Sequence, residues 1–147
     1  MLGADGVLVG TRFVASRESE APEGFRQAIV RADGDATIKS NSVDVVRKRY
    51  WPNPEFVVRV LRNGFVLKWH GREREIEKAI DTEYERFWSA FNAGDADNSG
   101  VLMGEVSGLI HDAPPAAQIV KDMVEGACLL LGPHSRYVGN GETASSR

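Results

Sequence analysis

A glycine–threonine pair directly after an apolar run is the feature of this sequence best suited to chemistry. Gly10 and Thr11 follow the Val-Leu-Val run at residues 7–9, and a short helix is expected to begin near Arg12. Glycine lets a backbone approach an anion closely, and N–H groups at the start of a helix point toward it. The arrangement predicts a phosphate site, although the same pattern also fits a plain strand-to-helix turn.

A second stretch resembles a calcium loop. Residues 95–100, in the order Asp-Ala-Asp-Asn-Ser-Gly, match the first half of an EF-hand loop. The last loop position, which should be a bidentate glutamate, is Val106, and Glu105 comes one place early. Gly104 and Gly108 disfavour an exiting helix. We therefore interpret the stretch as an ordinary polar loop and predict no metal site.

No set of residues in the sequence forms a recognisable catalytic constellation. A Cys/His metal cluster, a Gly-x-Ser-x-Gly elbow and a Walker-type loop are all missing from the sequence. The histidines His70, His111 and His134 are interpreted as surface or helix-end residues. We predict no catalytic residue within this chain.

Composition limits the class of protein. The chain has 147 residues, 42% hydrophobic and 27% charged, with a formal charge of −3, as expected for one soluble domain without a basic face for nucleic acid. No apolar run is long enough to span a membrane, and the start has no signal-peptide pattern. The lone Cys128 lies in an apolar run and is predicted to be a packed thiol in a reducing compartment, by default the cytoplasm.

The first half of the chain reads as alternating short elements. The apolar run at residues 7–9 predicts a strand buried on both faces, as in a parallel sheet covered by helices. A helix is expected from Pro22 until the Asp-Gly-Asp sequence at residues 33–35. Residues 36–39 suit extended chain, residues 43–46 fit either a helix or a strand, and the Asn-Gly at 63–64 predicts a turn.

The second half reads as helical. Residues 69–93 predict one long helix whose apolar face packs in the core, and a loop follows at residues 94–100. The last helix is expected to start near Pro114 and Pro115 and to bury one side, formed by Ile119, Met123, Ala127 and Leu130. The tail from residue 139 to 147 is polar and is predicted to be disordered. An isolated buried strand needs neighbours, which this chain does not obviously supply.

Residues 2–13, in the order Leu-Gly-Ala-Asp-Gly-Val-Leu-Val-Gly-Thr-Arg-Phe, strongly resemble the last strand of the nitronate monooxygenase (2-nitropropane dioxygenase) family. The Glu-Ser at 18–19 also fits, and Leu-Arg-Asn at 61–63 looks like the family's arginine–asparagine element. Residues 103–110 resemble its glycine-rich segment, and residues 115–120 its closing helix. These elements occur in the family's order and cover residues 2 to about 131.

The resemblance implies an enzyme that binds FMN and oxidises alkyl nitronates with O2 to carbonyl compounds and nitrite. It implies FMN contacts for Gly10 and Thr11 only. Arg12 either contributes charge or is a structural arginine. Flavin-dependent enoyl-ACP reductases share much of this strand pattern, so an oxidoreductase of that kind is an alternative activity.

The implied fold is α/β: the C-terminal fragment of a TIM barrel, with its last strand and helix, followed by a mostly helical extension. We predict barrel at residues 1–34, extension at 35–138 and tail at 139–147. A complete barrel needs eight strands, and the family's catalytic histidine precedes this region. The chain alone is therefore expected to be inactive. The alternative is a non-catalytic remnant or complementing subunit that self-associates or docks on the missing barrel half.

Overall fold

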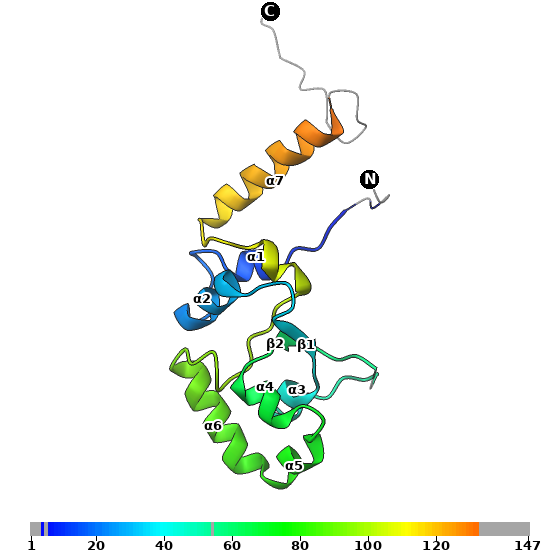
Figure 1. The fold of residues 1–147 in the computed structure, drawn as a ribbon, viewed down its shortest axis with the longest axis vertical. Helices are drawn as coiled ribbons and strands as arrows, with labels where there is room; N and C mark the ends of the chain where they lie inside the picture. Colours follow the sequence, from blue (N-terminus) through cyan, green and yellow to red (C-terminus); the bar gives the residue numbers. More distant parts are fainter. Residues whose placement is uncertain (1–3, 5, 54, 133–147) are drawn as a thin grey trace, which may run out of the picture.

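The chain is a helix-rich α/β structure with one small sheet (Figure 1). The computed structural model describes residues 4, 6–53 and 55–132. Within these residues, no helix combines the length and apolar character needed to cross a membrane. The predicted tail and His134 lie outside the described residues.

One group of elements surrounds the predicted phosphate loop. Helix α1 (Thr11–Val14) and helix α2 (Glu23–Arg31) pack with the 3-10 helix η1 (Glu105–Leu109). Pro22 immediately precedes α2, as predicted, and its carbonyl accepts the first helical hydrogen bond at 2.9 Å. The shared apolar core joins two segments that are far apart in the sequence: Ala15, Phe25, Ile29, Val101, Met103 and Ile110.

The sheet links this group to the rest of the molecule. Strand β1 (Thr37–Lys39) pairs antiparallel with β2 (Arg59–Leu61), and Ile38 lies opposite Val60. Leu102 forms an isolated antiparallel bridge to Val60 on the other side of β2. Extended chain at residues 36–39 is thus confirmed, whereas β2 was not foreseen.

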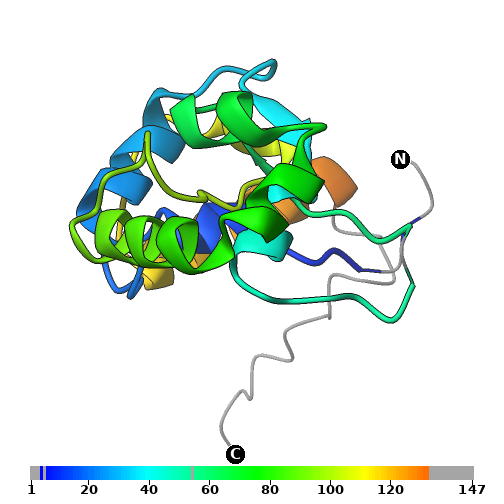
Figure 2. The same cartoon turned by 90° about the horizontal axis from the view of Figure 1, so that it is seen from below.

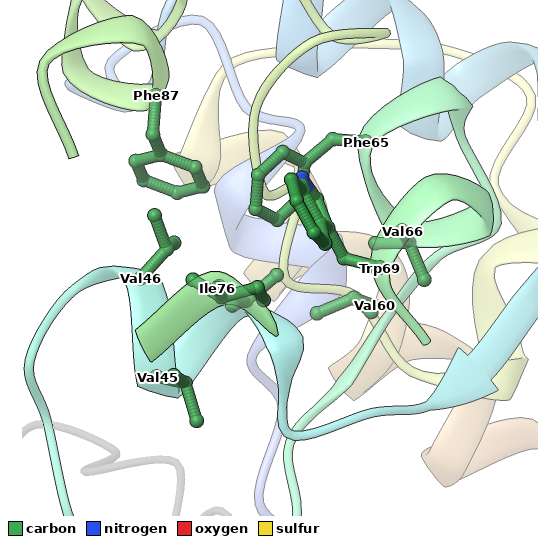
Figure 3. Packing of buried hydrophobic residues seen from close by; sticks show 9 residues of the cluster. Val45, Val46, Val60, Phe65, Val66, Trp69, Ile76 and Phe87 are labelled. Atoms are coloured by element: carbon green, nitrogen blue, oxygen red, sulfur yellow. The ribbon is translucent and has the colours of Figure 1, made fainter. Parts of the chain in front are cut away.

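Four helices enclose the second core: α3 (Ser42–Val46), α4 (Gly64–Trp69), α5 (Glu73–Lys78) and α6 (Ile80–Asn92). Figure 3 shows Val46, Phe65 and Phe87 directed toward one another from α3, α4 and α6. Phe65 and Phe87 meet edge to face with ring centroids 5.2 Å apart. The sequence left residues 43–46 open between helix and strand, and they are helical.

The prediction of one long helix over residues 69–93 is wrong. The helical region is divided at Gly71, whose φ of +76° is left-handed, and again at Ala79, where α5 ends. The predicted turn at Asn63 is also wrong, because Asn63 caps the start of α4. The shorter helices fold around the core in Figure 2 instead of continuing in one line.

The strand predicted at residues 7–9 is not a strand in this structure. Val7 is 84% exposed and Leu8 fully exposed, at 101%. A strand requires a neighbour for its N–H and C=O groups, and the described residues provide none here. Val7 and Leu8 are therefore apolar residues that no described part of this chain buries.

Helix α7 (Ala116–Leu131) begins directly after Pro115, as predicted, and extends away from the other helices (Figure 1). The predicted buried side is mostly wrong. Ile119 is 1% exposed, but Met123 is 40% and Leu130 is 89% exposed, because no other described element covers the later turns. Cys128 is exposed as well, which corrects the prediction of a packed thiol.

Candidate functional site

Gly10 and Thr11 line an apolar groove of about 640 Å³ at the start of α1. The groove is formed by three segments that are far apart in the sequence: residues 7–12, the glycine-rich segment at 104–110, and α7. Its lining residues are Val7, Leu8, Val9, Gly10, Thr11, Arg12, Gly104, Val106, Leu109, Ile110 and Met123. Two of the segments predicted to matter, the Gly-Thr step and the glycine-rich segment, are thus brought together.

A hydrogen bond fixes these two segments to each other. The Gly104 backbone N–H donates to Thr11 Oγ1 at 2.9 Å, across 93 positions of sequence. The threonine hydroxyl is satisfied as an acceptor by this bond, while its own hydrogen remains available to a second acceptor. Thr11 therefore both holds the glycine-rich segment and presents a donor to the groove.

The backbone at Gly10 and Thr11 is open toward a ligand. A side chain added at Gly10 would meet nothing within 4 Å. The Phe13 and Val14 N–H groups donate to the Gly10 carbonyl at 2.9 and 3.0 Å, which leaves the Thr11 and Arg12 N–H groups without an acceptor among the described residues. Two amides and one hydroxyl are thus free donors at one place.

Arg12 has a structural role in this chain. Its guanidinium donates to the Asp112 carbonyl at 2.7 Å and to Asp112 Oδ1 at 2.6 Å. The Arg12 side chain is 19% exposed and that of Asp112 is 67% exposed. The pair connects α1 to the segment before α7, so the positive charge of Arg12 is already matched by a carboxylate.

The Asn63 of the arginine–asparagine element organises the polar loop at residues 94–100. Asn63 Oδ1 accepts from the Val66 N–H at 2.9 Å, and its Nδ2 donates to the carbonyls of Ala96 at 2.7 Å and Ser99 at 2.5 Å. Asp97 accepts from the Gly64 N–H at 2.8 Å. Asn63 is buried away from the groove and stabilises the fold.

Asp95, the first acidic residue of the calcium-like loop, forms its hydrogen bonds within the loop itself. A hydrogen bond from the Asn98 side chain, supported by the backbone N–H groups of Asp97 and Asn98, holds the pKa of Asp95 below its ordinary value. Asp95 accepts these bonds at 2.8–3.1 Å. No cluster of metal-ligating side chains occurs among the residues that the structure describes.

Of the three histidines, the structure describes His70 and His111, and these lie at a helix end and on the surface, as predicted. His70 caps the C-terminal end of α4, and its Nδ1 lies 3.2 Å from Ser40 Oγ. His111 is exposed on the segment before α7. Neither lines the groove at Gly10.

Sequence reasoning noted Glu18 only as part of the family resemblance and did not foresee the contacts of Glu18 and Asp112 near the groove. Glu18 Oε2 accepts from the Ala116 N–H at 2.8 Å and so caps α7. Asp112 holds Arg12, and the two are 100 positions apart. The pairing of Asp112 with Arg12 leaves no pattern in the local sequence, because the two residues are far apart in the chain. For Glu18 there was an indirect signal, since Pro115 marked the start of a helix whose first N–H groups need an acceptor.

The fold resembles that of a larger solved protein. The structure of FabK from Thermotoga maritima matches with a TM-score of 0.64 at 28% identity, covering 84% of this chain and 37% of that chain. A second structure, of a FabK point mutant from the same organism, matches with a TM-score of 0.58 at 27% identity. It covers 84% of this chain and 34% of that one.

Curated relatives agree on a family. A nitronate monooxygenase from Neurospora crassa is 30% identical over 130 residues, covering 86% of this chain and 32% of the relative. Nitronate monooxygenase npaC from Metarhizium robertsii is 31% identical over 138 residues, covering 88% and 37%. The chain thus spans about a third of the length of these relatives. The nitronate monooxygenase family model matches residues 1–126, and the chain belongs to that family.

Proposed function

We propose that this chain supplies the C-terminal part of an FMN-dependent TIM barrel that oxidises alkyl nitronates with O2 to carbonyl compounds and nitrite. Within it, Gly10 and Thr11 hold the FMN phosphate. The hydrogen bond from Gly104 to Thr11 Oγ1 carries this proposal, because it places the Gly-Thr step and the glycine-rich segment on one groove. FMN supplies the electron transfer when it is bound.

The free donors fit a phosphate group. The Thr11 and Arg12 amides and the Thr11 hydroxyl can donate to phosphate oxygens, and the missing side chain at Gly10 leaves room for close approach. Arg12 is engaged with Asp112, so we assign the binding to neutral donors and not to its charge.

The exposed run at residues 7–9 supports assembly with the rest of a barrel. Val7 and Leu8 are apolar and exposed, and the run has no strand partner among the described residues. Pairing with a neighbouring strand would satisfy its N–H and C=O groups and bury its side chains on both faces. The partner we propose is the missing barrel half, with a nitronate and O2 as small-molecule substrates.

The chain alone is expected to be inactive, because we assign only phosphate binding, and no catalytic role, to the described residues of the groove. Purified chain should therefore show no stoichiometric flavin absorption band and no nitrite release from a nitronate. A chimera in which the chain replaces the matched third of the Neurospora crassa relative should bind FMN and release nitrite.

The same pair of measurements separates the alternatives. A chimera that binds FMN without releasing nitrite would favour the enoyl-ACP reductase-like activity or a non-catalytic complementing subunit. A chimera that folds but binds no flavin would contradict the proposal. Robust nitrite release by the 147-residue chain alone would contradict the expectation that it is incomplete.

A further inference from the structure

A buried carboxylate on α3 opens onto a pocket separate from the groove at Gly10. Asp44 is only 4% exposed. Its Oδ2 accepts from Trp51 Nε1 at 3.0 Å, while its Oδ1 has no hydrogen-bond donor among the described residues. Asp44 Oδ1 is not one of the fully enclosed polar atoms that lack a partner, so it is accessible and can accept a hydrogen bond from a donor outside the chain.

The backbone after α3 brings the indole to this carboxylate. The Arg49 N–H donates to the Asp44 carbonyl at 2.9 Å and the Lys48 N–H to the Val45 carbonyl at 3.0 Å. These are the two bonds of a Schellman motif, and Lys48 takes the left-handed position with φ of +56°. The reversal returns Trp51 over Asp44, so the Trp51 bond to Oδ2 is built into the chain path.

The pocket beside Asp44 has aromatic walls. Its volume is about 400 Å³, at the lower end of the range for small-molecule sites. Tyr50, Trp51 and Phe56 line it, and the rings of Trp51 and Phe56 meet edge to face with centroids 6.4 Å apart. These side chains are 71%, 49% and 58% exposed and so form an exposed aromatic patch.

The lining of the pocket carries one more carboxylate than guanidinium group, and Arg47 interacts with Asp44 from outside the lining. Three carboxylates line the pocket, those of Asp44, Glu73 and Glu77, against two guanidinium groups. Burial lowers the pKa of the neighbouring Arg47, and Asp44 partly counteracts this by raising it. Asp44 nevertheless forms no ion pair with another described residue.

We propose that this pocket binds a primary alkylammonium group. An ammonium N–H would fill the free Asp44 Oδ1 as a charge-assisted hydrogen bond, and the cation would lie against the aromatic faces of Trp51 and Phe56. The methylene groups would cover the exposed rings. A neutral or anionic ligand would lack the charge-assisted hydrogen bond to Asp44 and the contact of a cation with the aromatic faces.

The test is a titration of the ¹⁵N-labelled full chain with n-butylammonium chloride at constant ionic strength, followed by NMR. The chain contains three tryptophans, and the Trp51 indole N–H signal should shift while those of Trp69 and Trp88 stay in place. A dissociation constant on the order of millimolar is expected for so small a ligand. No shift at tens of millimolar, roughly ten times that value, would overturn the proposal.

Matched variants separate the buried charge from general electrostatics. Asp44→Asn keeps an oxygen for the Trp51 N–H and should weaken binding about tenfold or more. Asp35→Asn makes the same change in net charge at an exposed aspartate outside the pocket and should leave binding unchanged. Equal binding by wild type and a folded Asp44→Asn, checked by circular dichroism, would overturn the role of Asp44.

Two further probes keep the proposal testable if Asp44→Asn fails to fold. With the wild-type chain, 1-butanol should bind at least about tenfold more weakly than n-butylammonium, and tetramethylammonium, which has no N–H donor, should also bind more weakly. If 1-butanol binds as tightly as n-butylammonium, the pocket recognises only the alkyl chain, and the proposal is overturned. Nα-acetyl-lysine amide distinguishes the source: binding as tight as butylammonium indicates a lysine side chain, and weaker binding indicates a free amine.

Discussion

Removal of the Asn63 side chain should cost a large share of the stability of this fold. Asn63 is 5% exposed and makes three hydrogen bonds, one that caps α4 and two to the carbonyls of Ala96 and Ser99. Loss of a helix cap costs about 1 kcal/mol. Each buried carbonyl left without its donor costs about 1 kcal/mol or more. Asn63→Ala should therefore reduce the free energy of unfolding by about 3 kcal/mol.

The assay is chemical unfolding followed by circular dichroism, with thermal unfolding as a second measure. A loss of this size corresponds to a fall of the melting temperature on the order of 10 °C. Asn63→Asp should be no better than Asn63→Ala, because it keeps the cap acceptor but places a carboxylate against two carbonyl oxygens.

Asn41 provides the matched control. It occupies the N-cap position of α3, is exposed, and makes no side-chain capping bond. Asn41→Ala should change the free energy of unfolding by no more than about 0.5 kcal/mol. An Asn63→Ala variant as stable as the wild type, or an equal loss of stability in both alanine variants, would show that the hydrogen bonds of Asn63 do not stabilise the fold.

Three other perturbations follow from single contacts. Lys48→Gly should stabilise the chain by about 0.5 kcal/mol in urea unfolding, since glycine relieves the left-handed φ at the cost of an exposed ion pair with Asp81 and the contact of the Lys48 ammonium with the Tyr84 ring. Gly24→Ala should destabilise by about 2 kcal/mol, because the added carbon would lie 2.0 Å from the Gly94 carbonyl oxygen; Gly34→Ala, with open space, is its control. The pKa of Asp95 is lowered, so its stabilising contribution is present above the ordinary carboxyl pKa and is lost as pH falls below about 4. Asp95→Asn should flatten that acid limb of the stability curve, and an unchanged limb would show that Asp95 does not contribute.

Local signals predicted the starts of α2 and α7 but not what covers these helices. Pro22 and Pro115 each precede a helix, since a proline carbonyl can accept the first helical bond while its missing N–H is not needed. The apolar spacing of α7 showed which residues share a side, yet burial depends on a partner that spacing does not reveal. Met123 and Leu130 are exposed for this reason.

The failed strand at residues 7–9 has the same origin. Strand formation needs a second strand, and an apolar run cannot indicate whether one is present. The break at Gly71 did have a local signal, because a glycine lies inside the apolar pattern. The prediction of one long helix gave more weight to the regular apolar spacing of the residues after it.

The candidate site was foreseen in part. Gly10 and Thr11 were identified from residue type, and the glycine-rich segment from the family resemblance, but the bond between Thr11 and Gly104 spans 93 positions. The Asn63 network could not be foreseen either, because its carbonyl partners lie 33 and 36 positions away.

The phosphate assignment at Gly10 and Thr11 is tested most directly by comparing FMN with riboflavin, which lacks the phosphate. In the chimera with the Neurospora crassa relative, FMN should bind at least about tenfold more tightly than riboflavin. Gly10→Ala meets no atom of the chain within 4 Å, so it should weaken FMN binding without loss of stability and leave riboflavin binding unchanged. Thr11→Ser should behave as the wild type. Equal losses for both flavins, or no loss of FMN binding in Gly10→Ala, would contradict the assignment.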